Sequence, residues 1–178
     1  MGQPRSLDRV FNGVSVALSR DKRLKRRFAT EPKFERPVWD VVFKHCARSF
    51  GKDAVSEILL SSHESLHLPG RSAEAWKRFK EHGGPNVEVL RSGRRLDMVV
   101  LVPDTQGIGI EVECLSGKSP ATQLIVGLGQ ALLALGKRDC VILVVNCPRA
   151  SLKERNEVRK VARRMLRHAP RLRLVVTP

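Results

Sequence analysis

Apolar residues gather in four short stretches that are typical of buried strands. Residues 96–102 and 108–115 are two of them, and the Asp and Gly of residues 104–107 predict a turn that folds the two strands into a hairpin. Residues 140–145 form a continuous apolar run, as expected for a central strand covered on both faces. Residues 172–176 predict a last strand.

Helical patterns lie between and around these strands. Residues 72–82 begin with a candidate N-cap, Ser72, and are followed by two glycines, and residues 120–135 begin with proline after a serine and close at Gly136. In residues 152–166 apolar positions recur at helical spacing and Lys and Arg fill the rest. Its apolar side should pack on the sheet, although a basic amphipathic helix could also bind a membrane or a partner groove.

The first seventy residues have a weaker pattern. We expect a short helix around residues 10–18, followed by a basic arm at residues 20–27 that either grips phosphates or is disordered. Residues 37–60, interrupted at Gly51, indicate a helical hairpin. It could dock as a helix-turn-helix, but a hairpin that caps the core is favoured because nothing marks a recognition helix.

Three carboxylates interrupt the apolar hairpin: Asp97, Glu111 and Glu113. Side chains alternate along a strand, so Glu111 and Glu113 share one face, and pairing about the turn would bring Asp97 within reach of them. Clustered acids are unfavourable unless a cation neutralises them, and oxygen ligands suit Mg²⁺ or Mn²⁺ rather than zinc. The alternative is that the two glutamates form the solvated face of an edge strand and pair with arginines.

The order of these elements and acids resembles the core of the PD-(D/E)xK nuclease superfamily, which includes restriction endonucleases and archaeal Holliday junction resolvases. In that resemblance, Glu74 corresponds to the helix glutamate and Asp97 to the aspartate of the second strand. Glu111 corresponds to the acid of the third strand, and Gln123 or Gln130 to the glutamine of the next helix.

The resemblance implies an α/β fold with a restriction endonuclease-like core, a central mixed sheet of four to five strands flanked by helices. It covers residues 72–146. We therefore expect an N-terminal basic arm and helical extension at residues 1–70 and a nuclease-like core at residues 71–178.

The implied site holds Mg²⁺ or Mn²⁺ between Asp97, Glu111 and the backbone carbonyl of Val112. Glu74 would support these ligands or hold a second ion. Glu113 stands where the superfamily usually has lysine, so it could be a general base or a further ligand. Lys118, in the loop that follows, could supply the missing positive charge.

The composition indicates a polyanionic partner. The chain has 33 Lys plus Arg against 18 Asp plus Glu, a net charge of +15. With no tyrosine and few other aromatic residues, it lacks the base-stacking platform of a single-strand binder. DNA is the expected partner, although RNA is not excluded. The candidate nucleic-acid-binding residues are Arg23, Lys25, Arg26, Arg27, Arg94, Arg95, Gln123 and Gln130.

The remaining features limit the class of protein. The four cysteines lack zinc-ligand spacing, which favours a reducing, cytoplasmic location, and no apolar run is long enough to span a membrane. We expect a metal-dependent endonuclease acting on duplex or branched DNA, with a homodimer allowing both strands to be cut. The alternatives are a catalytically inactive nuclease-like module or subunit of a DNA-processing complex, and a scaffold protein that uses only its positive charge.

Overall fold

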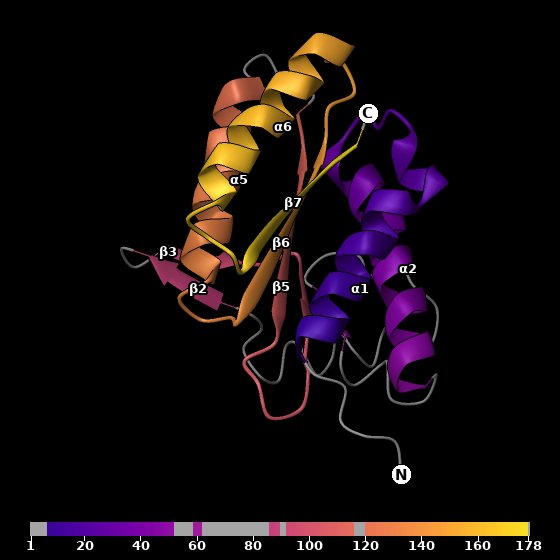
Figure 1. The fold of residues 1–178 in the computed structure, drawn as a ribbon, viewed down its shortest axis with the longest axis vertical. Coiled ribbons are helices and arrows are strands. Elements are labelled where there is room, and N and C mark those ends of the chain that lie inside the picture. Colours follow the sequence, from indigo (N-terminus) through magenta and orange to yellow (C-terminus); the bar gives the residue numbers. More distant parts are fainter. Residues whose placement is uncertain (1–6, 52–58, 62–85, 90–91, 116–119, 178) are drawn as a thin grey trace.

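The computed structural model describes residues 7–51, 59–61, 86–89, 92–115 and 120–177. They form an α/β fold around a five-stranded mixed sheet (Figure 1). Its strands, in spatial order, are β1 (Leu59–Ser61), β4 (Met98–Val100), β5 (Ile108–Cys114), β6 (Cys140–Asn146) and β7 (Leu172–Thr177). The first three strands pair antiparallel and the last three pair parallel. The predicted α/β class and mixed sheet are therefore confirmed.

Helices cover both faces of this sheet (Figure 1). Helices α1 (Leu7–Arg20) and α2 (Glu31–Phe50) lie on one face, and α5 (Pro120–Ala134) and α6 (Leu152–Leu166) lie on the other. A separate two-stranded ribbon is formed by β2 (Asn86–Val89) and β3 (Ser92–Arg95). None of the described helices combines the length and apolar character needed to cross a membrane.

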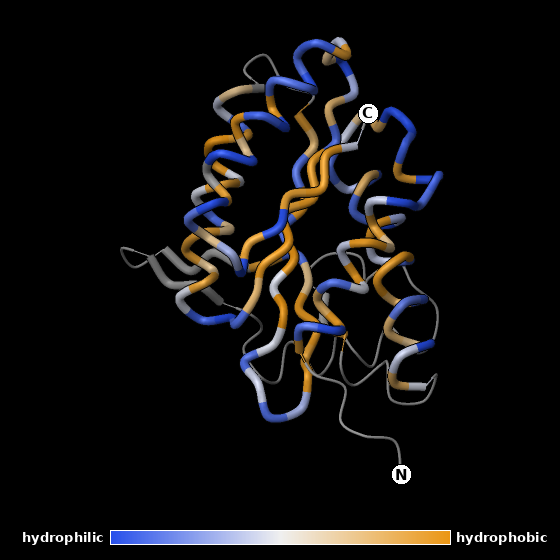
Figure 2. The backbone as a smooth tube through the Cα atoms, viewed as in Figure 1, coloured by the Kyte–Doolittle hydropathy of each residue, from blue (hydrophilic) through white to orange (hydrophobic). Residues whose placement is uncertain are grey.

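The alternation of side chains along the strands divides the interior into two cores. Ile110 and Ile142 pack with α1 and α2, whereas Val141 and Leu143 pack with α5. All seven residues of β6 are buried, which explains its uninterrupted apolar sequence. In Figure 2 the strands at the centre of the molecule are correspondingly the most hydrophobic part of the chain.

The N-terminal helices are part of the first core. Val14 and Leu18 of α1 and Phe34 of α2 are fully buried with residues of β5 and β6. The expected helix at residues 10–18 is confirmed as α1. The first half of the expected helical hairpin at residues 37–60 is confirmed as α2, which ends at Phe50 and is capped by Gly51, whereas residues 52–58 lie outside the described residues. Leu59 and Leu60, at the end of the expected hairpin, belong to strand β1 instead of a helix.

Two further expectations need correction. The strand predicted at residues 96–102 is only three residues long, because Asp97 lies at a bend and the pairing with β5 ends at Val100, two residues before the turn at residues 103–105. Helix α6 is confirmed, but Leu152 and Val161 are 64% and 48% exposed instead of packing on the sheet. Ala162 is buried, and the partly buried Leu166 packs against the second core.

Because β5, β6 and β7 are parallel, their C-terminal ends meet at one edge of the sheet. We call this the carboxyl edge and define it by the strand ends Cys114, Asn146 and Thr177. The N-terminal ends of α5 and α6 lie at the same end of the molecule, as does the short 3₁₀ helix η1 (Lys22–Lys25) (Figure 1). In open sheets of this kind, the crevice outside the carboxyl ends of the strands is the usual place for a site.

Candidate functional site

Asp97 lies at the end of the β4–β5 ladder, close to the carboxyl edge. The backbone pairing of the two strands stops at Met98 and Ile110, and the Asp97 carboxylate extends it by accepting a 2.7 Å hydrogen bond from the Val112 N–H. The side chain is only 7% exposed. The hairpin that the sequence predicts therefore does bring Asp97 against the strand that carries the two glutamates.

Burial raises the pKa of Asp97 to about 7, although the Val112 hydrogen bond acts in the opposite direction. The negative charges of Glu31 and Glu113 raise this pKa further. Glu31, in the first turn of α2, is therefore part of the same group of acids. The sequence gives no sign of this, since an acid in the first turn of a helix is normally explained by the helix dipole.

Glu111 and Glu113 lie on an interior strand. Strand β5 is paired on both sides, with β4 and with β6, and Glu111 is 6% exposed. The alternative of a solvated edge strand is therefore wrong. Glu113 lies directly against α5, because a Cβ added at Gly127 would be 2.6 Å from its Cγ and 3.0 Å from its Oε1.

Both candidate glutamines are on α5. Gln123 and Gln130 are three or four residues away from Gly127, so they share the helix face that meets Glu113. Both are partly buried. The two glutamines that the resemblance assigns to the next helix are therefore on the side of α5 that faces Glu113, and their role stays a prediction.

The carboxylates of Asp97, Glu111 and Glu113 are suitable ligands for a divalent cation, but they do not form a full set of metal ligands by themselves. Carboxylate oxygens are the ligands that Mg²⁺ and Mn²⁺ prefer, and a cation would relieve the repulsion around Asp97. Nevertheless, within the part of the chain that the structure describes, no group of three or more His, Cys, Asp or Glu side chains could hold a metal ion. Glu74 and Lys118, two further members of the expected site, lie outside the described residues.

The basic segment after α1 is ordered against the core. Leu24 is fully buried in η1, so the expectation of a disordered arm is wrong. Arg23 is engaged in ion pairs with Asp21 at 2.9 Å and Asp40 at 3.0 Å, and the hydrogen bond that it donates to the Asp21 carboxylate raises the Arg23 pKa. Its charge is therefore largely compensated within the protein.

The exposed cations of this segment are Lys22, Lys25, Arg26 and Arg27, and the last three adjoin the backbone groups that Asn146 binds. Asn146 fixes them at the carboxyl edge: its Nδ2 donates to the Arg26 carbonyl at 2.9 Å, and its Oδ1 accepts from the Phe28 N–H at 3.3 Å. Asn146 is fully buried. This clamp brings three exposed positive charges to the same end of the sheet as the acids.

Two other candidate cations lie elsewhere in the fold. Arg94 and Arg95 belong to β3, in the small ribbon that is separate from the main sheet. That ribbon contacts α5 through β2. The structure therefore places these two arginines on a different element from the clamped segment.

Comparisons with family models, with curated proteins and with solved structures found no match. The resemblance to PD-(D/E)xK nucleases consequently rests on residues and element order. From β4 through β5 and α5 to β6, the order agrees with that expectation. It differs at the sheet edge, where the strand that pairs with β4 is β1, which precedes the expected helix at residues 72–82.

Proposed function

We propose that this protein is a metal-dependent endonuclease that hydrolyses phosphodiester bonds in DNA. One observation carries the proposal: acids that repel one another around the buried Asp97 lie at the same end of the sheet as a clamped, exposed basic segment. An acid group inside a chain of net charge +15 is unexpected for a protein that only needs to attract polyanions.

Asp97 and Glu111, together with the Val112 carbonyl, would hold Mg²⁺ or Mn²⁺. Such an ion would polarise the scissile phosphate and lower the pKa of the attacking water. Glu113 would accept a proton at one of its carboxylate oxygens, in the place where the superfamily usually has lysine. Its fixed position against Gly127 supports this role, because a proton acceptor must be held at a defined distance from its donor.

Lys25, Arg26 and Arg27 would bind the phosphate backbone. Such contacts orient a nucleic acid without selecting its sequence. They also release counterions, so the affinity should fall steeply with salt. A homodimer, in which each copy cuts one strand, and a cytoplasmic location remain predictions.

A second candidate function is a nuclease-like module that binds nucleic acid without cutting it. It is favoured by the finding that the described acids do not form a complete metal site. The hydrogen bond from the Val112 N–H also gives Asp97 a structural role that needs no metal. The two candidates share the basic surface and differ only in hydrolysis.

Cleavage of supercoiled plasmid in Mg²⁺ or Mn²⁺ separates these candidates. The parent should cut, and Asp97→Ala and Glu111→Ala should abolish cutting while DNA binding in a gel-shift assay without metal is retained. Asp104→Asn, in the exposed turn after β4, is the matched control and should cut normally. Binding without cleavage by the parent would establish the second candidate, and cleavage that survives both alanine substitutions would overturn the site.

A further inference from the structure

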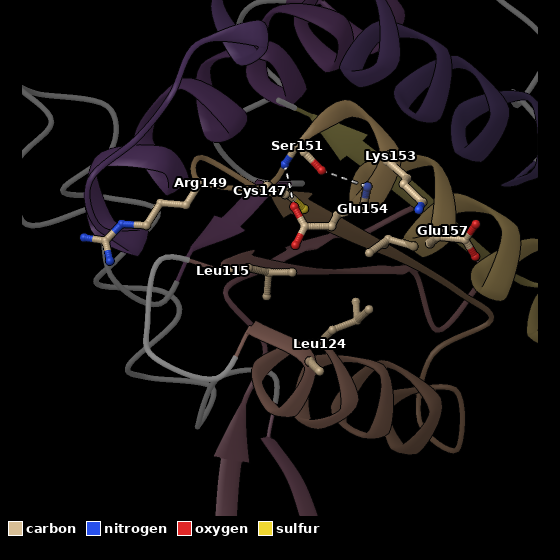
Figure 3. A pocket seen from close by; sticks show the side chains of 11 residues that line it. Leu115, Leu124, Cys147, Arg149, Ser151, Lys153, Glu154 and Glu157 are labelled. Carbon is tan, nitrogen blue, oxygen red and sulfur yellow. Dashed lines mark hydrogen bonds between the residues drawn. The ribbon is translucent and has the colours of Figure 1, made fainter.

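A pocket of about 760 Å³ opens at the carboxyl edge, between the first turns of α5 and α6 (Figure 3). Figure 3 shows Leu115 and Leu124 on one side of it, with Ser151 and Glu154 opposite them. Further apolar surface comes from Ala121, Cys147, Ala150 and Val158. A volume in this range and a mainly apolar wall with a few polar groups are typical of sites that bind small organic groups.

The pocket adjoins the acids of the proposed active site. Leu115 follows β5 and continues its pairing with β6, since its N–H donates to the Asn146 carbonyl at 2.8 Å. It therefore lies on the same strand face as Glu113, two residues and roughly 6.6 Å further along. On α5, Leu124 precedes Gly127, the glycine that contacts Glu113, by one turn.

The charged groups of the pocket lie on its α6 side and on the segment that leads to α6. Arg149 and Lys153 border it, as do two acids, Glu154 and Glu157.

One of those two acids is already engaged. Glu154 accepts a 2.7 Å hydrogen bond from the Ser151 N–H, and its own N–H donates to the Ser151 hydroxyl at 3.2 Å. This reciprocal capping box fixes the Glu154 carboxylate at the N-terminus of α6, where it offsets the helix dipole. The Glu154 carboxylate is therefore occupied at the helix terminus, which leaves Arg149 and Lys153 to contact an anionic group of a ligand and Glu157 to accept a hydrogen bond from it.

We infer that this pocket receives one unpaired nucleobase of the DNA substrate, while the cations at its mouth hold the neighbouring phosphates. The inference rests on the proposed function and narrows its substrate class to DNA with an extrahelical or unpaired nucleotide beside the cleavage point. Proteins that bind an extruded base enclose it between apolar side chains and contact its polar edge. Here Leu115 and Leu124 provide the apolar contact, and the Glu157 carboxylate can accept from an exocyclic amine.

Two substitutions in α5 test this binding. Ala121 and Thr122 are both exposed in the first turn, but only Ala121 lines the pocket. Ala121→Phe should fill the pocket, and Thr122→Phe is the matched control that adds the same ring outside it. The probes are a duplex with one unpaired 2-aminopurine and the fully paired duplex of the same sequence, both titrated in EDTA so that no hydrolysis occurs.

The full chain should bind the unpaired probe about tenfold more tightly than the paired one, the gain expected for enclosing one base. The 2-aminopurine fluorescence should rise on binding, because none of the described residues that line the pocket is aromatic and able to quench it. Ala121→Phe should lose both effects, and Thr122→Phe should keep them.

Equal affinity of the full chain for the two probes would overturn the inference, and so would identical behaviour of the two phenylalanine variants. The test is independent of cleavage. Tighter binding of the unpaired probe by a chain that never cuts plasmid would uphold the inference and reject the endonuclease. Cleavage of plasmid without tighter binding of the unpaired probe would uphold the endonuclease and reject the inference.

Discussion

Replacing Asp97 by asparagine should stabilise the protein at neutral and alkaline pH, although it removes a proposed metal ligand. The Asp97 carboxyl is buried, and its pKa is raised from the ordinary value of 3.8 to about 7, first by burial and then by Glu31 and Glu113. Asparagine has nearly the same shape and keeps an oxygen that can accept the hydrogen bond of the Val112 N–H. It carries no charge to desolvate.

The size and the sign of the effect follow from the raised pKa. Below about pH 4 the carboxyl is protonated in both the folded and the unfolded state, so its ionisation does not lower the free energy of unfolding. Between about pH 4 and 7 the unfolded chain ionises first, and the folded state loses stability as the pH rises. Since each pKa unit corresponds to about 1.4 kcal/mol, the loss levels off above pH 7 at about 4 kcal/mol, an upper limit for the gain from Asp97→Asn.

Urea denaturation of the parent and of Asp97→Asn, in EDTA at about pH 4, 6 and 8, measures this gain. The difference in free energy of unfolding should be close to zero at the lowest pH and largest at the highest. Asp104→Asn, in the exposed turn, should leave the free energy of unfolding nearly unchanged at every pH. A variant that is less stable than the parent at pH 8, or a difference that does not depend on pH, would refute the assignment of a buried, repelled carboxylate.

Three further predictions follow from single contacts. Gly127→Ala should lower the free energy of unfolding by about 1–3 kcal/mol, because the new Cβ would lie 2.6 Å from the Glu113 Cγ, whereas Gly129→Ala, with open space around it, should raise stability by about 1 kcal/mol. Equal effects in urea denaturation would contradict the contact between α5 and β5. Asn146→Ala removes the hydrogen bonds to Arg26, Phe28 and Thr177 and should cost on the order of 3 kcal/mol by the same assay; a loss below about 1 kcal/mol would argue against the clamp. Arg27→Gln should reduce the slope of log affinity for DNA against log salt concentration by about 1, and an unchanged slope would show that Arg27 makes no phosphate contact.

The central elements of the fold could be predicted because each has a strong local pattern. The apolar run of β6, the capped and glycine-terminated α5 and the amphipathic α6 all appear where the sequence indicates them. The hairpin of β4 and β5 could be predicted equally well, because a glycine marks its turn. In the structure that residue, Gly107, has a φ of 82°, a conformation that favours glycine. Local patterns failed for β1, which has only three residues and pairs with a strand about forty positions away.

The candidate site was predictable only in part, for a related reason. Asp97, Glu111 and Glu113 stand out because each is an acid within an apolar strand sequence. Glu31 does not, because its proximity to Asp97 depends on where α2 begins relative to a sheet formed much later in the chain. The Asn146 clamp is also long-range, since its partners Arg26 and Phe28 are 120 and 118 residues away.

Calorimetric titration of Mn²⁺ into the metal-free full chain tests most directly whether these acids hold a cation. The parent should give a saturable heat of binding, and Asp97→Asn, which should remain folded, should give none. A parent without saturable heat, or a variant that binds Mn²⁺ as the parent does, would contradict the proposed site and leave a protein that binds nucleic acid through its positive charge.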